Sequence, residues 1–265
     1  MVPIIGRCKL CRQDRELRSS HFLPAALWIG ARDRTLKNPN PVVMTRMSSR
    51  TSSGQLVAHL LCDACEDRFN NNGERYVLSW LSPRKAADGV FPLLDRLSVA
   101  LPIHSSPMLS VYSADRVGLE TEKFGYFALS ILWRAAVHRW RMPDGRLTQK
   151  IELEELEEAL RKYLLLETDL PSQFVLIFTV CRDKESRQTL FPPAARQGAK
   201  FPSYGMLLLG VHFNIVVGQS LPPDLRDHCC MRSSRHPIFL RDCRDDTFSA
   251  FSTVASTSRP VPGLR

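Results

Sequence analysis

Apolar residues recur at three- and four-residue steps in two stretches of the second half of the chain, which places them on one face of a helix. The first stretch begins at Phe124 and predicts a helix of about five turns that reaches Trp140 and stops before Pro143. The second runs from Leu153 to Leu164, with acidic residues at its start and basic residues near its end, as the helix dipole favours. We expect these two helices to pack together.

Strands are predicted farther along the chain, where apolar and β-branched residues form short continuous runs. The clearest run covers residues 174–180, and two more runs, 206–209 and 211–217, meet at Gly210. We therefore expect a sheet beside the two helices.

The first third of the chain has a less regular pattern. Charged residues up to Leu17 predict little strand, and the stretch 22–31, opened by Pro24, predicts a short helix. Residues 35–55 are rich in Asn, Pro, Ser, Thr and Gly, which predicts a loop or an irregular hairpin.

A brief strand is predicted over residues 55–61, and a helix follows it from about Asp63 to Pro83. The run Asn-Asn-Asn-Gly at 70–73 is expected to break or bend this helix, since none of these residues favours a helix interior.

The resulting fold class is α+β. Residues 1–82 are expected to form one module and residues 83–118 a connector with a short helix around 90–99. Residues 119–243 then form an α+β domain, and residues 244–265, rich in Ser, Thr, Arg and Pro, form a disordered tail.

Composition and charge limit the classes of protein to which this chain can belong. The chain has 265 residues, 44% of them hydrophobic, which is typical of a folded protein. Its net charge is +9, and residues 1–82 hold twelve Lys/Arg against seven Asp/Glu. This excess suits a nucleic-acid partner but does not require one. No apolar run approaches the roughly 18–20 residues that span a membrane, and the N-terminus lacks the apolar core of a signal peptide, so we expect a cytoplasmic protein.

The cysteines supply the strongest chemical signal. Cys8 and Cys11 form one Cys-x-x-Cys pair, and Cys62 and Cys65 form a second. In each pair a tight turn lets both thiolates reach one tetrahedral ion at about 2.3 Å, so the four residues predict a zinc site. All four positions would be filled by sulfur, which makes the predicted zinc structural.

The motifs between these pairs carry a resemblance. Ser20-His21-x-x-Pro24 follows the first pair, and Leu61 and Glu66 flank the second. In this order the motifs resemble the zinc-stapled branch of the HNH nucleases, over about residues 8–82. The resemblance implies a treble-clef or ββα-metal fold for the module. It further implies His21 as general base, a catalytic Mg²⁺ or Mn²⁺ ion, and a role in bacterial defence.

Two positions differ from the HNH pattern. Ser20 stands where the family has a metal ligand, and Glu66 stands where it has His or Asn. Glutamate is a good ligand for a hard cation, but in the first turn of a helix it also stabilises the helix dipole. A related group of bacterial proteins, described only as HNH-like, also resembles the chain at Trp133-Arg134-Ala135.

Two functions follow as hypotheses. The first is an endonuclease that hydrolyses nucleic acid, DNA in preference to RNA, with His21 and Glu66 as its catalytic residues. The second is a non-catalytic zinc finger that binds nucleic acid or a protein partner.

Other features carry less weight. His59 is expected to have a packing role, and Trp133-Arg134 is favoured as an anchor on a helix surface over a contact with a base or phosphate. A group at 228–243 with three cysteines and two histidines has spacing that fits no standard metal finger.

Overall fold

The computed structural model describes residues 3–32, 37–44, 48–52, 54–81, 91–196, 198–246, 249 and 259–260. The chain begins with an antiparallel sheet of three strands, in the order β1 (Ile5–Arg7), β2 (Asp14–His21) and β5 (Val57–Cys62). The prediction of little strand before Leu17 is wrong. In β2 only Ser20 is buried, so this strand lacks the apolar alternation that would have revealed it.

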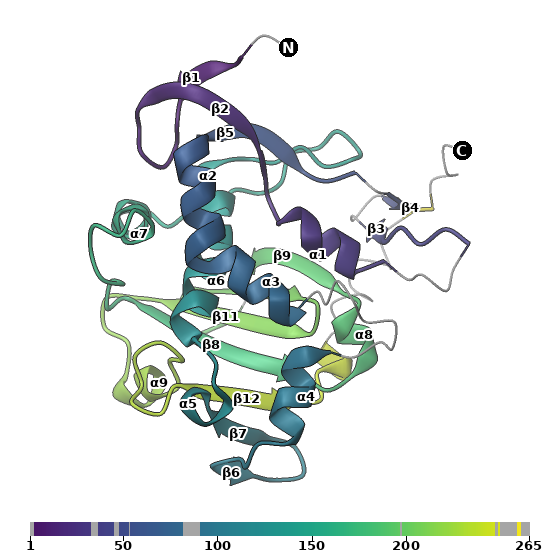
Figure 1. Ribbon diagram of the computed structural model, residues 1–265, viewed down its shortest axis with the longest axis vertical. Helices are drawn as coiled ribbons and strands as arrows, with labels where there is room; N and C mark the ends of the chain where they lie inside the picture. The colour runs from purple at the N-terminus through teal and green to yellow at the C-terminus, as the bar shows by residue number, and fades with distance from the viewer. Residues whose placement is uncertain are drawn as a thin grey trace.

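One long helical segment follows this sheet (Figure 1). It consists of α2 (Asp63–Phe69), a π-helical stretch η1 (Asn70–Glu74) and α3 (Arg75–Leu81). The predicted break at residues 70–73 is therefore a wide turn within a continuous helix. The predicted end at Pro83 lies outside the described residues.

Shorter elements complete the N-terminal part. The predicted helix over 22–31 is α1 (Ala25–Gly30), which begins directly after Pro24. The predicted irregular hairpin is formed by β3 (Val42–Met44) and β4 (Ser48–Thr51), and β13 (Arg259–Pro260) pairs with β4 from the far end of the chain.

A larger sheet has seven strands in the order β6-β7-β12-β8-β11-β10-β9. Its strands are β6 (His104–Ser105), β7 (Ser110–Ser113), β8 (Phe174–Cys181), β9 (Leu190–Ala195), β10 (Ser203–Leu208), β11 (Val211–Val217) and β12 (Pro237–Arg241). The three predicted strands are confirmed as β8, β10 and β11. Leu209 and Gly210 both have positive φ, 48° and 84°, which suits the tight turn between β10 and β11.

The central helix α6 (Thr121–Val137) lies between this sheet and the α2–α3 segment (Figure 1). Of its 17 residues, 14 are buried, so it is covered on all sides and not on one face only. It ends at Val137, three residues before the predicted Trp140, because the backbone at His138 is extended. The second predicted helix is α7 (Leu156–Leu164), which packs beside α6.

Four short helices remain in the described chain: α4 (Pro92–Ser98), α5 (Ala114–Val117), α8 (Lys184–Arg187) and α9 (Pro223–Asp227). Helix α4 is the one expected around 90–99. The mixed helices and sheets confirm the α+β class.

One buried hydrophobic cluster runs through the described molecule. It includes Leu61 and Phe69 from the first part of the chain, Phe127 from α6, and Phe178 and Phe213 from the large sheet. The boundaries at 82, 118 and 243 and the disorder of the tail stay predictions, and much of residues 244–265 lies outside the described part. Within the described chain, none of the helices has the length and apolar character needed to cross a membrane.

Candidate metal centre

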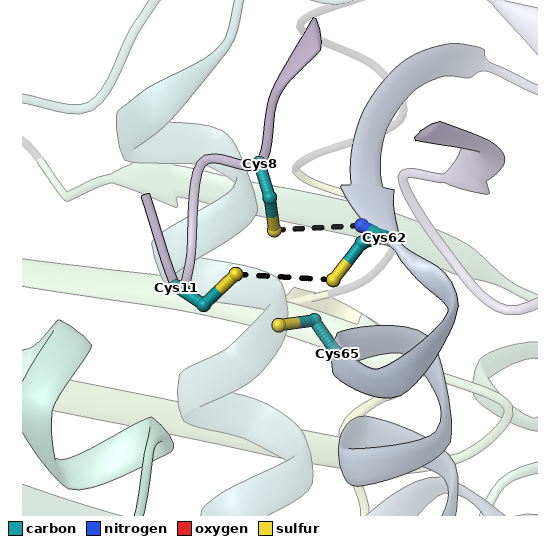
Figure 2. Close-up of side chains that lie close together, drawn as sticks. All are labelled: Cys8, Cys11, Cys62 and Cys65. Atoms are coloured by element: carbon teal, nitrogen blue, oxygen red, sulfur yellow. Dashed lines mark hydrogen bonds between the residues drawn. The ribbon is translucent and has the colours of Figure 1, made fainter. Parts of the chain in front are cut away.

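The four cysteines of the two Cys-x-x-Cys pairs converge on one point, and we call them the thiol cluster (Figure 2). Cys8 and Cys11 come from the turn between β1 and β2, Cys62 ends β5, and Cys65 lies in the first turn of α2. All four sulfur atoms lie within 4.8 Å of one another, and the Sγ atoms of Cys11 and Cys62 are 3.8 Å apart. The structure therefore brings together the four ligands that the spacing predicts.

Backbone hydrogen bonds shape the turn that carries Cys8 and Cys11. The Arg12 N–H donates to the Cys8 carbonyl at 2.9 Å, and the Lys9 N–H donates to the Leu60 carbonyl at 3.0 Å. Arg12 adopts a left-handed backbone with φ of 59°, which closes the turn after the second cysteine. The Cys62 N–H donates to the Cys8 sulfur at 3.4 Å, so the turn and β5 are joined at the cluster itself.

The close approach of the sulfur atoms and their burial shift the pKa values of Cys8, Cys62 and Cys65. A hydrogen bond from the Cys65 thiol, with support from backbone N–H groups, lowers the pKa of Cys8, and the same bond raises the pKa of Cys65. Burial raises the pKa of Cys62. A bound cation would displace the thiol protons of the cluster, because thiolates are the form that binds metal.

The donor set suits a soft or borderline divalent ion. Three of the four cysteines are buried, and Cys11 is half-buried. Four thiolates complete a tetrahedral shell and leave no position for water, which is the arrangement of structural and not catalytic sites. The cluster can hold a metal ion such as zinc.

Helix α7 holds the outer side of the Cys8–Cys11 turn, a contact that sequence reasoning missed. Arg161 donates from Nη1 to the Leu10 carbonyl at 2.7 Å, although the two residues are 151 positions apart. Glu158 accepts from Arg161 at 2.7 Å and from Arg12 at 2.5 Å. These arginines hold the pKa of Glu158 at about 2, Arg161 contributing most. The only sequence signal was the basic end of α7, which the helix dipole also explains.

Ser20 has a structural partner. Its Oγ accepts a hydrogen bond from the Leu61 N–H at 3.1 Å, and Ser20 is 1% exposed. The pairing of β2 with β5 shifts register at this place, so the bulge frees the Leu61 N–H from the ladder. Serine satisfies that buried donor in the position where the HNH family has a metal ligand.

His21 is the last residue of β2, opposite Val57 of β5. Its neighbours Ser20 and Phe22 are both buried, whereas His21 is half-buried. Since successive side chains of a strand point to opposite faces, His21 faces away from the side on which Ser20 bonds to β5.

Glu66 lies in the first turns of α2, and its Oε1 atom is buried without a hydrogen-bond partner in the described structure. Within that part of the chain no hydrogen bond or ion pair joins His21 to Glu66, and neither belongs to a group of three or more close metal-ligating side chains. The roles predicted for these two residues stay hypotheses.

One secondary expectation, the surface position of Trp133-Arg134, is wrong. Trp133 is 0% and Arg134 2% exposed, so this pair lies inside the molecule and not on a helix surface. In the 228–243 group, His236 bonds to the Cys230 carbonyl, whereas Cys243 lies near Cys181. The group does not form a common centre among the described residues.

Basic residues surround the thiol cluster. A hollow of about 470 Å³ beside Cys8 is lined by Arg7, Lys9, Arg12 and Lys150, together with one acidic residue, Glu157. Arg12 pairs with Glu158, and Lys150 lies 3.9 Å from Glu152. Arg7 and Lys9 are exposed and form no ion pair with any residue that the structure describes.

Comparisons with protein-family models, curated proteins and solved structures give no match to this chain. The likeness to HNH proteins therefore rests on the ordered motifs alone.

Proposed function

We propose that the thiol cluster holds a structural zinc ion and that the surface around it binds nucleic acid, duplex DNA in preference to RNA. The zinc joins the Cys8–Cys11 turn to the junction of β5 with α2, two places that are about fifty residues apart in the sequence. Because a four-thiolate ion has no open position, its contribution is to hold this surface in shape.

The observation that carries the proposal is the pair of exposed cations, Arg7 and Lys9, on the two sides of Cys8, which form no ion pair within the described residues. Exposed cations without acidic partners are free to meet phosphate oxygens. Phosphate contacts dominate the affinity of proteins for nucleic acid and require no base-specific groups. Of the other arginines in this region, Arg12 and Arg18 are held by Glu158 and Asp63, and Arg15 donates to Gln13.

Fluorescence anisotropy with labelled duplex DNA and single-stranded RNA tests the proposal. The Arg7→Ala/Lys9→Ala variant is expected to bind DNA more weakly than the wild type. Its plot of log affinity against log salt should be shallower by about 0.9 for each phosphate that the variant no longer neutralises. Arg226→Ala is the matched control, since Arg226 is also exposed but lies on α9, away from β1 (Figure 1).

Equal affinity in the double variant and the wild type would contradict the proposed surface. No binding to either nucleic acid by the wild type would also contradict it and would favour a protein partner.

A second candidate function is metal-dependent hydrolysis of phosphodiester bonds by an HNH-like site. One observation favours it: the buried Oε1 of Glu66 has no hydrogen-bond partner in the described structure. A bound divalent cation would satisfy this oxygen. His21 would act as base on a water molecule, since a neutral imidazole accepts a proton near neutral pH.

Incubation with plasmid DNA and with RNA in Mg²⁺ or Mn²⁺ separates the two functions. Cleavage by the wild type that His21→Ala and Glu66→Gln abolish would support the nuclease. Binding without cleavage, or cleavage that persists unchanged in both variants, would exclude these catalytic roles.

A further inference from the structure

A second group of metal-ligating side chains lies in the large sheet, far along the chain from the thiol cluster. Cys181, Asp183 and Cys243 are all buried, and their ligand atoms lie within 4.8 Å of one another. The group does not follow a sequence motif, because its two cysteines are separated by 61 intervening residues.

The topology of the sheet explains how these residues meet. Strands β8 and β12 are the one neighbouring pair within this sheet that runs parallel in the described structure. The ends of two parallel strands lie at the same edge, and Cys181 is indeed paired with Arg241. The chain beyond each strand then supplies Asp183 and Cys243.

Asp183 is held rigidly by backbone donors from two segments. Its Oδ1 accepts from the Ser186 N–H at 2.8 Å, and its Oδ2 accepts from the Cys243 N–H at 2.9 Å. These bonds fix the orientation of the carboxylate. Carboxylates that bind metals are commonly oriented by such hydrogen bonds.

Cys181 and Cys243 line a cavity of about 580 Å³. His212 and Arg241 also line this cavity, and Arg241 is paired with Asp246 at 2.5 Å. Two thiolates and a carboxylate would carry a charge of about −3 against +2 for the ion. Because Arg241 already pairs with Asp246, the loaded centre would keep a charge of about −1.

We propose that Cys181, Asp183 and Cys243 bind a divalent ion of zinc type through three protein ligands, with the fourth position open to the cavity. Three protein ligands and one exchangeable position are the arrangement found in catalytic zinc sites, in contrast to the closed thiol cluster. The open position would take water or a small exogenous ligand such as azide.

Cobalt titration of metal-free, reduced protein tests this second centre, because thiolate-bound Co²⁺ absorbs visible light with a spectrum that depends on its ligands. The wild type is expected to bind two Co²⁺ ions per chain, one in each centre. Azide should alter the spectrum of the open centre only. Cys181→Ala should bind one Co²⁺ and lose the response to azide.

Two further variants separate a loss of metal binding from misfolding, and circular dichroism of each variant would detect misfolding directly. Cys230→Ala removes a fully buried thiol outside both clusters and should still bind two ions. Asp183→Asn keeps both thiols and should bind the second ion at least about tenfold more weakly, since even an outer partner of a ligand is worth 10- to 100-fold.

A single Co²⁺ in the wild type that Cys181→Ala leaves unchanged would overturn the proposal. A disulfide between Cys181 and Cys243 in protein purified with zinc would overturn it as well.

Discussion

Arg134 of α6 forms an ion pair with Glu74 of the helical segment that leaves the thiol cluster, with 2.6 Å between Nη2 and Oε1. The side chain of Arg134 is 2% exposed and that of Glu74 15%. The guanidinium also lies over the ring of Phe69, 4.8 Å from its centre. This ion pair links the helical segment of the N-terminal part to the buried helix α6 of the C-terminal part.

Removal of Glu74 is expected to be costly because it leaves Arg134 as an uncompensated buried charge. Glu74→Ala should lower the free energy of unfolding by about 3–5 kcal/mol. Asp63→Ala is the matched control, since the Asp63–Arg18 pair is exposed and should contribute under about 1 kcal/mol. Urea unfolding of both variants measures the difference, and equal small losses would show that the buried pair does not fasten the two parts.

Gly73 allows η1 to approach α6 closely. A Cβ atom at this position would lie 2.9 Å from the Phe127 nitrogen and 3.0 Å from the Lys123 carbonyl oxygen, both backbone atoms that cannot move aside. Gly73→Ala should therefore destabilise the protein by about 1–3 kcal/mol, although alanine is the better helix former. Asn71→Ala, at an exposed position in the same turn, should be neutral or slightly stabilising in the same thermal melts.

The role of Ser20 could be predicted from the sequence only in part. Its place in the motif showed a departure from the HNH pattern, but not the reason, because the bulge in β5 that frees the Leu61 N–H is a feature of strand pairing. Ser20→Ala should cost about 1–3 kcal/mol by leaving that buried donor unpaired. Ser20→Thr, which keeps the hydroxyl, should lose less in the same denaturant titration, and equal losses would assign the effect to packing.

The cysteine spacing sufficed to predict the thiol cluster, since each pair is local and the turn geometry is short-ranged. Periodicity likewise revealed α6, α7 and the apolar strands. Periodicity missed the features that depend on residues far apart in the sequence. Strand β2 is polar because it is exposed, and the group of Cys181, Asp183 and Cys243 is assembled only by the parallel pairing of β8 with β12. Arg134 was misplaced because charged residues are seldom fully buried, and its partner Glu74 lies 60 positions away.

His212 gives the stability of the protein a dependence on pH. Burial, with help from Arg196 and Arg241, lowers the pKa of His212 to about 4 from an ordinary value of 6.5. Between about pH 6.5 and about pH 4, His212 is therefore protonated in the unfolded chain but neutral in the folded chain. The free energy of unfolding should fall as the pH drops through this range. In His212→Gln this contribution should vanish, so the unfolding free energy of the wild type should fall relative to that of the variant as pH drops. A His212 NMR titration midpoint near its ordinary value would contradict the expectation.

The proposal that the thiol cluster holds a structural zinc ion is tested most directly by X-ray absorption at the zinc edge. The Cys181→Ala background isolates this cluster from the second centre. We expect one zinc ion per chain with four sulfur neighbours at about 2.3 Å, and loss of this signal in the further variant Cys62→Ser. A zinc shell that contains nitrogen or oxygen, or zinc retained unchanged after Cys62→Ser, would contradict a closed four-thiolate centre.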